Sequence, residues 1–141
     1  MKIAIINGPN LNLLGKREPG IYGAESFESF FTGLQSRHPG ADIIYYQSNI
    51  EGELIDEIQR RGHDCDGIIL NPGGYTHTSV AIGDAIAAVE TPVVEVHISN
   101  IFGREDFRKI SYVSARARGV ISGLGLKGYE LALEALMHPE P

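Results

Sequence analysis

The sequence predicts an α/β fold in which helices cover both faces of a parallel sheet. Two observations predict it: short apolar runs of strand length alternate with amphipathic segments of about ten residues, and Gly, Pro or Asn separates most of them. Strands and helices that alternate in this way form parallel sheets that are buried on both faces. The chain has 141 residues and shows no composition shift, repeat or low-complexity segment, so we expect one domain over residues 1–141.

Five apolar runs are the predicted strands. They span Lys2–Asn7, Asp42–Gln47, Gly67–Asn71, Pro92–His97 and a weaker Gly119–Ser122. The first contains the unbroken apolar stretch from Ile3 to Ile6. Such a run is typical of a strand that is covered on both faces.

Four amphipathic segments are the predicted helices, over Ser26–Ser36, Glu51–Arg61, Thr78–Ala88 and Lys127–Met137. Ser26 fits the N-cap of the first helix, with Ser29 in its first turn and Pro39-Gly40 after its end. Because crossovers between parallel strands are right-handed, few topologies remain, and the simplest is a five-stranded parallel sheet of order 2-1-3-4-5. We therefore expect a flavodoxin-like three-layer sandwich.

The charge of the chain argues against some classes of protein, nucleic-acid binders above all. The chain has 12 Lys and Arg against 18 Asp and Glu, a net charge of −6, and neither sign forms a long block. We expect no nucleic-acid partner, and any bound anion must meet a local cluster of Arg. No apolar run approaches the ~18 residues of a membrane span, and the first residues lack a signal-peptide pattern, which predicts a cytoplasmic protein. The single cysteine, Cys65, has acidic neighbours that raise a thiol pKa, and we interpret it as a packing residue.

The topology predicts where the chemistry lies. Ligands of open α/β sheets bind beyond the carboxyl ends of the strands, near the point where the strand order reverses. Polar residues gather after strands one, three and four, whereas the end of strand two carries no obvious chemistry. The loop from Asn7 to Gly23 is longer than a connection needs, so we interpret it as a binding loop with a movable cover.

Asn10, Asn12, Arg17 and Tyr22 are the candidates in this loop. Asn12 is as well suited to stabilising a turn as to a function, whereas for Asn10, which follows the strand end, the turn interpretation is weaker. An exposed Arg17 is by default a solvated charge. The functional alternative is that Arg17 lowers the pKa of Tyr22 from its reference value of about 10, so that a phenolate serves as a base.

Two histidines are further candidates. His77 is expected to open the third helix, either as a bystander to the N-cap or beside N–H groups that favour a carboxylate ligand. His97 ends the fourth strand, and Glu95 lies on the same side of that strand. His97 is either a buried, satisfied histidine or a proton donor oriented by Glu95, and its place at a carboxyl end favours the second interpretation.

Arg104 and Arg108 are four residues apart, so a short helix would place both on one face. Surface ion pairs with acids such as Glu105 are the simpler interpretation. Asp84, in the middle of the third helix, is either solvated or the partner of an Arg in another subunit.

The segment Gly123–Gly128 matches the pattern GxGxxG, but too little chain follows it for the acidic residue that a dinucleotide site needs. We interpret it as a close approach of helix to sheet. Neither a metal-ligand spacing nor a Gly-x-Ser-x-Gly elbow is present in the sequence.

Four blocks of sequence are more specific together than any single residue. They are INGPNLNLLGKREPGIYG, NPGGYTHTSVAIGDA, VEVHISNIFGREDFR and GLGLKGYELAL. In this order, and over nearly the whole chain, they resemble the type II 3-dehydroquinate dehydratases. The resemblance implies a flavodoxin-like fold, a dodecamer built from trimers, and dehydration of 3-dehydroquinate to 3-dehydroshikimate without a metal or an organic cofactor.

The resemblance also implies a role for each matched residue. Tyr22 matches the base that removes the C2 proton, and Arg17 the lid residue that favours its phenolate form. Asn10 matches the residue that holds a water against the enolate oxygen. His97 matches the acid that protonates the leaving C1 hydroxyl, with support from Glu95. The other matches are the substrate contacts Asn71, His77, Ile98, Ser99 and Arg108, with Asp84 reached from a neighbouring subunit and Arg104 as a lid or catalytic-site Arg.

Four residues at three places depart from the family pattern. Pro72 stands where many relatives carry Ala, and Gly83 and Phe102-Gly103 stand where larger or more polar residues are common. These departures bear on the lid and on the subunit contacts around Asp84 and leave the catalytic set intact.

The alternative function is a non-catalytic flavodoxin-like module for small-anion binding or assembly. A phosphate or nucleotide sensor would need a first loop rich in Ser, Thr and Gly, and this loop is built from Asn, Leu and Arg instead. A relative that keeps the fold but has no catalytic activity would have no structural need for this set of residues, which comprises Asn10, Arg17, Tyr22 and His97. The sequence therefore favours an enzyme.

Overall fold

The sheet has the predicted topology. The computed structural model describes residues 1–16, 20 and 24–141. Its strands are β1 (Lys2–Asn7), β2 (Asp42–Gln47), β3 (Gly67–Asn71), β4 (Val93–His97) and β5 (Gly119–Ser122). All neighbouring strands are parallel and their order is β2-β1-β3-β4-β5, which confirms the expected flavodoxin-like arrangement.

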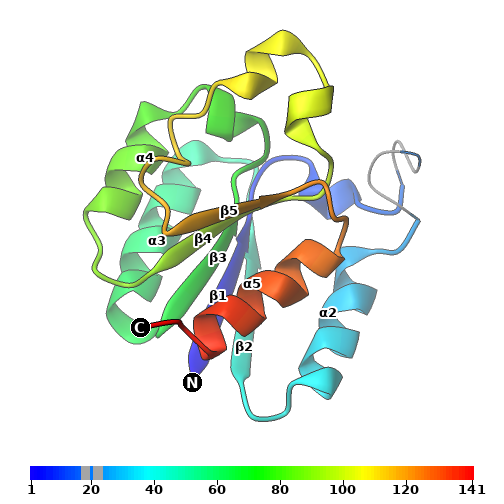
Figure 1. The fold of residues 1–141 in the computed structure, drawn as a ribbon, viewed down its shortest axis with the longest axis vertical. Helices are drawn as coiled ribbons and strands as arrows, with labels where there is room; N and C mark the ends of the chain where they lie inside the picture. Colours follow the sequence, from blue (N-terminus) through cyan, green and yellow to red (C-terminus); the bar gives the residue numbers. More distant parts are fainter. Residues whose placement is uncertain (17–19, 21–23) are drawn as a thin grey trace.

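In the described part of the chain, four α-helices cover the two faces of the sheet (Figure 1). They are α2 (Phe27–Arg37), α3 (Glu51–Asp64), α4 (Val80–Ala87) and α5 (Lys127–Met137). Helices α2 and α5 pack on one face, and α3 and α4 pack on the other. Successive side chains of β1 point to opposite faces of the sheet, so this strand contributes to the hydrophobic core on each face. Ile5 packs in the core with α2 and α5, and Ile6 packs in the core with α3 and α4.

Two of the described α-helices, α2 and α4, begin at a serine that caps the first turn. Ser26 Oγ accepts a hydrogen bond of 3.2 Å from the backbone N–H of Ser29, as the sequence predicts. Helix α4 begins later than expected, since Ser79 is its N-cap and accepts a bond of 2.9 Å from the N–H of Ile82.

The prediction that His77 opens the third helix is wrong. His77 ends a separate 3-10 turn, η2 (Gly73–His77), and the capped end of α4 comes after it. Gly73 adopts a φ of 59°, a left-handed conformation that Gly tolerates and that turns the chain at the start of η2. The N–H groups of α4 therefore do not form a carboxylate site with His77.

Close backbone packing explains two glycines. A Cβ at Gly83 would lie 2.3 Å from the carbonyl oxygen of Tyr112, so the segment around Tyr112 packs directly on α4 and no larger residue fits. A Cβ at Gly128 would lie 3.3 Å from side chains of both Val96 and Ile121, which is the close helix-to-sheet approach that the sequence predicts.

Cys65 lies between α3 and β3 and is 9% exposed, in keeping with a packing role. Burial raises the pKa of its thiol to about 12. No helix in the described part of the chain is long and apolar enough to cross a membrane.

Candidate active site

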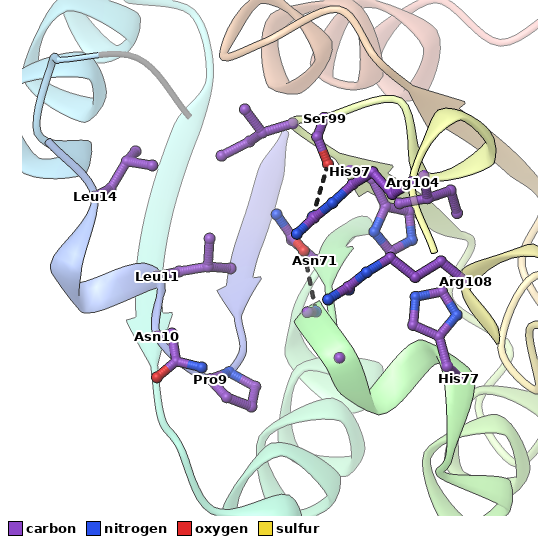
Figure 2. A pocket seen from close by; sticks show the side chains of 14 residues that line it. Pro9, Asn10, Leu11, Leu14, Asn71, His77, His97, Ser99, Arg104 and Arg108 are labelled. Carbon is purple, nitrogen blue, oxygen red and sulfur yellow. Dashed lines mark hydrogen bonds between the residues drawn. The ribbon is translucent and has the colours of Figure 1, made fainter. Parts of the chain in front are cut away.

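A pocket opens beyond the carboxyl ends of β1, β3 and β4 (Figure 2). Leu11 and Leu14, from the 3-10 turn η1 (Leu11–Leu13) and the residue after it, give it an apolar side. Its polar lining follows the three strands that the topology predicts. The predicted site residues that line it are Asn10, Asn71, His77, His97, Ile98, Ser99, Arg104 and Arg108.

Of the described candidates, three do not line this pocket: Glu95, Asp84 and Asn12. Asn12 Oδ1 instead accepts a bond of 3.5 Å from Gln47 Nε2. Glu95 lies behind the pocket wall and is fully buried. Asp84 is exposed on α4 and is not part of the pocket of a single chain. Arg17 and Tyr22 lie outside the described residues.

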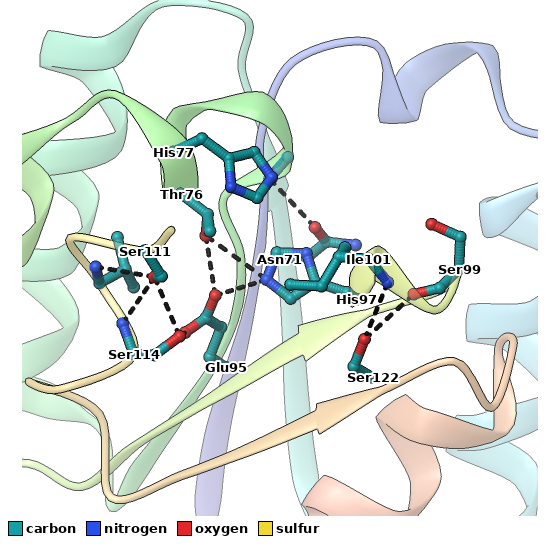
Figure 3. A network of polar contacts seen from close by, with 12 residues as sticks. Asn71, Thr76, His77, Glu95, His97, Ser99, Ile101, Ser111, Ser114 and Ser122 are labelled. Carbon is teal, nitrogen blue, oxygen red and sulfur yellow. Dashed lines mark hydrogen bonds and ion pairs between the residues drawn. The ribbon is translucent and has the colours of Figure 1, made fainter. Parts of the chain in front are cut away.

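Glu95 and His97 form a buried pair, with Nε2 of His97 hydrogen-bonded to Oε2 of Glu95 (Figure 3). Thr76 Oγ1 donates a bond of 2.8 Å to the same carboxylate oxygen, and Ser114 Oγ donates one of 2.6 Å to the other. The sequence did not identify Thr76 and Ser114 as partners of Glu95. Thr76 lies 19 residues before Glu95 and Ser114 lies 19 residues after it, and no local pattern links residues so far apart. Each carboxylate oxygen therefore has its own partner, and the carboxylate cannot rotate freely.

The surroundings of Glu95 keep it ionised. Burial alone raises the pKa of this carboxyl group. The hydrogen bond and charge of His97 act in the opposite direction, and with the bonds from Ser114 and Thr76 they hold the pKa below its ordinary value of 4.5. An ionised Glu95 orients the ring of His97 through Nε2 and leaves Nδ1 as the nitrogen that can exchange a proton with a ligand.

His77 has a defined orientation. Its Nδ1 lies 2.7 Å from the carbonyl oxygen of Ile110, which can only accept, so Nδ1 carries the proton. Nε2 is buried and has no partner among the described residues. Burial lowers the pKa of His77 below 6.5 and outweighs the opposing effect of the Ile110 carbonyl. His77 thus presents a neutral acceptor that suits a ligand hydroxyl.

Two arginines supply the positive charge that the composition requires for an anionic ligand. Arg104 follows the turn η3 (Ile101–Gly103) and Arg108 lies in the turn η4 (Asp106–Lys109), so two 3-10 turns replace the expected short helix. Arg104 Nη1 donates a bond of 3.1 Å to Ser99 Oγ. Both also meet Glu105, with Nε–Oε distances of 3.7 Å for Arg104 and 3.0 Å for Arg108. Arg104 and Arg108 therefore each pair with the exposed Glu105 and also line the pocket.

Asn10 is held in an unusual backbone conformation. Its φ of 71° is the only positive value among the described residues other than glycine, and Asn tolerates this region better than most side chains. Asn49 Oδ1 accepts a bond of 3.0 Å from the backbone N–H of Asn10. Gln47 Nε2 donates to the same Asn49 oxygen and to the carbonyl of Gly8, both at 3.1 Å.

The end of strand two contributes no residue to the pocket, in keeping with the sequence, but it supports the loop that does. Gln47 ends β2 and Asn49 follows it, and although neither lines the pocket, both fix the loop that does. The signal was available in the sequence, because two carboxamides stand at the carboxyl end of a strand that neighbours β1. No group of three or more His, Cys, Asp or Glu in the described segments is arranged to hold a metal ion.

Comparison with known proteins identifies the family. A family model described as dehydroquinase class II matches residues 1–137. A 3-dehydroquinate dehydratase of Methylococcus capsulatus is 54% identical over 96% of this chain and 93% of its own length. One of Aliarcobacter butzleri is 52% identical over 97% of this chain and 85% of its own. The crystal structure of a type II dehydroquinase from Butyrivibrio crossotus covers 98% of both chains with 47% identity and a TM-score of 0.94. The chain belongs to the class II dehydroquinase family of enzymes.

Proposed function

We propose that this enzyme dehydrates 3-dehydroquinate to 3-dehydroshikimate by anti elimination through an enolate. The observation that carries the proposal is the buried Glu95–His97 pair in the wall of a pocket that also contains Arg104 and Arg108. Elimination of water next to a ketone needs an acid for the departing hydroxide, and the substrate carries a carboxylate that requires positive charge or N–H donors. The pocket offers both.

His97 is the acid of the proposed reaction. When the C1–O bond breaks, the departing oxygen takes a proton from His97 and leaves as water. Glu95 stabilises the protonated ring before this step and orients it throughout.

Tyr22 and Arg17, which lie outside the described residues, complete the reaction as base and lid residue. A Tyr22 phenolate removes the C2 proton, and the electron pair of that C–H bond forms the enolate. Asn10 holds a water against the enolate oxygen, and its anchored loop at the pocket edge suits this task.

The remaining lining residues bind the substrate in this proposal. The backbone N–H groups of Ile98 and Ser99 receive its carboxylate, and Asn71, His77 and Arg108 contact its hydroxyl groups and charge. No lysine contributes to the described lining, which gives a Schiff-base route no support. The reaction as proposed uses no metal or organic cofactor.

We also propose that the protein assembles into trimers and then dodecamers, in which a neighbouring subunit reaches the site through Asp84. Exposed apolar side chains of Val80, Ile110 and Tyr112 lie on and beside α4, the helix that carries Asp84. Such a patch suits burial between subunits. A cytoplasmic location is part of the same proposal.

Ultraviolet absorbance tests the proposed reaction, because the product is a conjugated enone and the substrate is not. Purified protein mixed with 3-dehydroquinate should give a rise in absorbance that persists with a chelator and after treatment with substrate and borohydride. A His97→Ala variant should reduce the rate by about 10²–10⁴-fold. A flat trace from folded wild-type protein would refute the proposal.

A further inference from the structure

We propose that Tyr129 is a positioning residue of the active site, which fixes the side-chain amide of Asn71 so that it donates a hydrogen bond to a hydroxyl oxygen of the substrate. This inference rests on the proposed function, in which Asn71 contacts the substrate. Tyr129 lies on α5 and is fully buried, so it touches no ligand itself. It acts through Asn71, which lines the pocket.

Three hydrogen bonds connect the residues at the ends of β1 and β3. Asn7 and Asn71 are direct partners in the register of these strands. Asn71 Nδ2 donates a bond of 2.7 Å to the Tyr129 hydroxyl, which donates one of 2.8 Å to Asn7 Oδ1. The backbone N–H of Gly73 donates a bond of 3.1 Å to Asn71 Oδ1.

The direction of each bond follows from one backbone group. The N–H of Gly73 can only donate, so the Asn71 atom that faces it must be the oxygen. The Asn71 nitrogen then faces Tyr129, whose oxygen must accept. The single proton of the Tyr129 hydroxyl is therefore directed to Asn7 Oδ1. The Asn71 carboxamide therefore has one allowed orientation.

The hydroxyl keeps the proton that this arrangement needs. Tyr129 has no exposed surface, and burial raises the pKa of its phenol. Its ring is held by the aromatic core, with Phe27 in an edge-to-face arrangement at a centroid distance of 5.0 Å. The acceptor for Asn71 is thus neutral, fixed in place and always available.

One hydrogen of the Asn71 amide remains for a ligand. The nitrogen has two hydrogens, and Tyr129 receives one of them. No described residue accepts the other, and Asn71 lies in the pocket lining. Because the amide is held at both ends, a substrate hydroxyl meets a donor that is already oriented, and binding loses little rotational freedom.

The variant Tyr129→Phe tests the proposal, since it keeps the buried ring and removes only the hydroxyl. We expect KM to rise about tenfold, which corresponds to about 1.4 kcal/mol, with kcat within about twofold. Leu133→Ala is the matched control, because Leu133 is buried on the same helix and has no polar contact with the pocket. Both variants should lower Tm, but only Tyr129→Phe should change KM.

The same substitution in an Asn71→Ala background shows whether Tyr129 acts through Asn71. In that background Tyr129→Phe should leave KM unchanged. An unchanged KM in the single variant, or an equal rise with and without Asn71, would overturn the proposal.

Nitrogen-15 spectra of the ligand-free protein give a readout that does not depend on turnover. The two side-chain amide protons of Asn71 should have well-separated shifts in the wild type and should converge in Tyr129→Phe. Identical Asn71 signals in the two proteins would also overturn the proposal. An inactive wild type whose Asn71 signals respond as expected would refute the proposed function alone.

Discussion

Ser114 donates a hydrogen bond of 2.6 Å to Oε1 of Glu95, the carboxylate oxygen that His97 does not use. Ser114 lies beyond the arginine-bearing turns, so the segment that supplies positive charge to the pocket also holds the carboxylate behind it. The orientation of His97 therefore depends on contacts from two separate parts of the chain.

This arrangement predicts how stability depends on pH. The folded-state pKa of Glu95 is below its ordinary value of 4.5, so ionised Glu95 stabilises the fold above that pH, and this contribution is lost as pH falls through the lower, folded-state pKa. Ser114→Ala removes one of the hydrogen bonds that lower the pKa of Glu95. The free energy of unfolding of this variant should therefore fall less steeply as the pH is lowered. Denaturant unfolding between pH 3 and pH 7 measures how the free energy of unfolding changes with pH, over a range of about four units that includes the reference pKa of a carboxyl group. Glu25→Gln, at an exposed position, is the control, and equal slopes for wild type and Ser114→Ala would contradict the argument.

Tyr22→Phe should abolish turnover with little effect on stability. The proposed base is lost, which predicts a fall in kcat of about 10²–10⁴-fold, whereas a loop hydroxyl adds less than about 0.5 kcal/mol to the free energy of unfolding. Steady-state rates and thermal unfolding check the two parts. Tyr46→Phe, on β2 and away from the pocket, should behave as wild type. A near-normal rate in Tyr22→Phe would remove Tyr22 as the base.

Arg108→Ala should mainly weaken substrate binding. Arg108 lines the pocket, and loss of a charged hydrogen bond predicts a rise in KM of about 10–100-fold with a smaller change in kcat. Arg60→Ala is a suitable control, since Arg60 pairs with Glu57 on α3 and does not line the pocket. If KM stays unchanged, Arg108 is only the surface partner of Glu105.

Two substitutions at Asn10 should separate backbone strain from chemistry. The φ of 71° is easy for Gly and costly for Ala, so Asn10→Ala should be less stable than Asn10→Gly by about 1 kcal/mol. Both variants lack the side-chain amide and should lose kcat to a similar extent. Chemical denaturation and steady-state kinetics measure the two effects. A large difference in kcat between the variants would assign the role of Asn10 to loop geometry alone.

The sequence predicted the sheet and the main lining of the pocket for a physical reason. Buried parallel strands are continuous apolar runs, and such runs are visible without knowledge of the fold. The strand order then placed His97 and Asn71 at the same edge of the sheet. The alternation of a strand placed Glu95 on the side of His97.

The supporting contacts could not be predicted in the same way. Tyr129 appears in the sequence as a core aromatic of an amphipathic helix, and its bond to Asn71 joins residues 58 positions apart. Local pattern carries no information on such a pair. His77 was misplaced for a different reason, because a 3-10 turn and the start of an α-helix share the same small and polar residues.

Gly83 lies outside the pocket lining, yet its packing affects the orientation of His77 in the pocket. The carbonyl of Tyr112 packs on Gly83, the N–H of Tyr112 bonds to the carbonyl of Thr76, and the carbonyl of Ile110 holds His77. A methyl group added at Gly83 would push this segment outward and withdraw the partner that sets the protonated nitrogen of His77. A substitution outside the pocket lining would thereby alter a histidine that lines the pocket, so libraries aimed at this enzyme should treat Gly83 as part of the site.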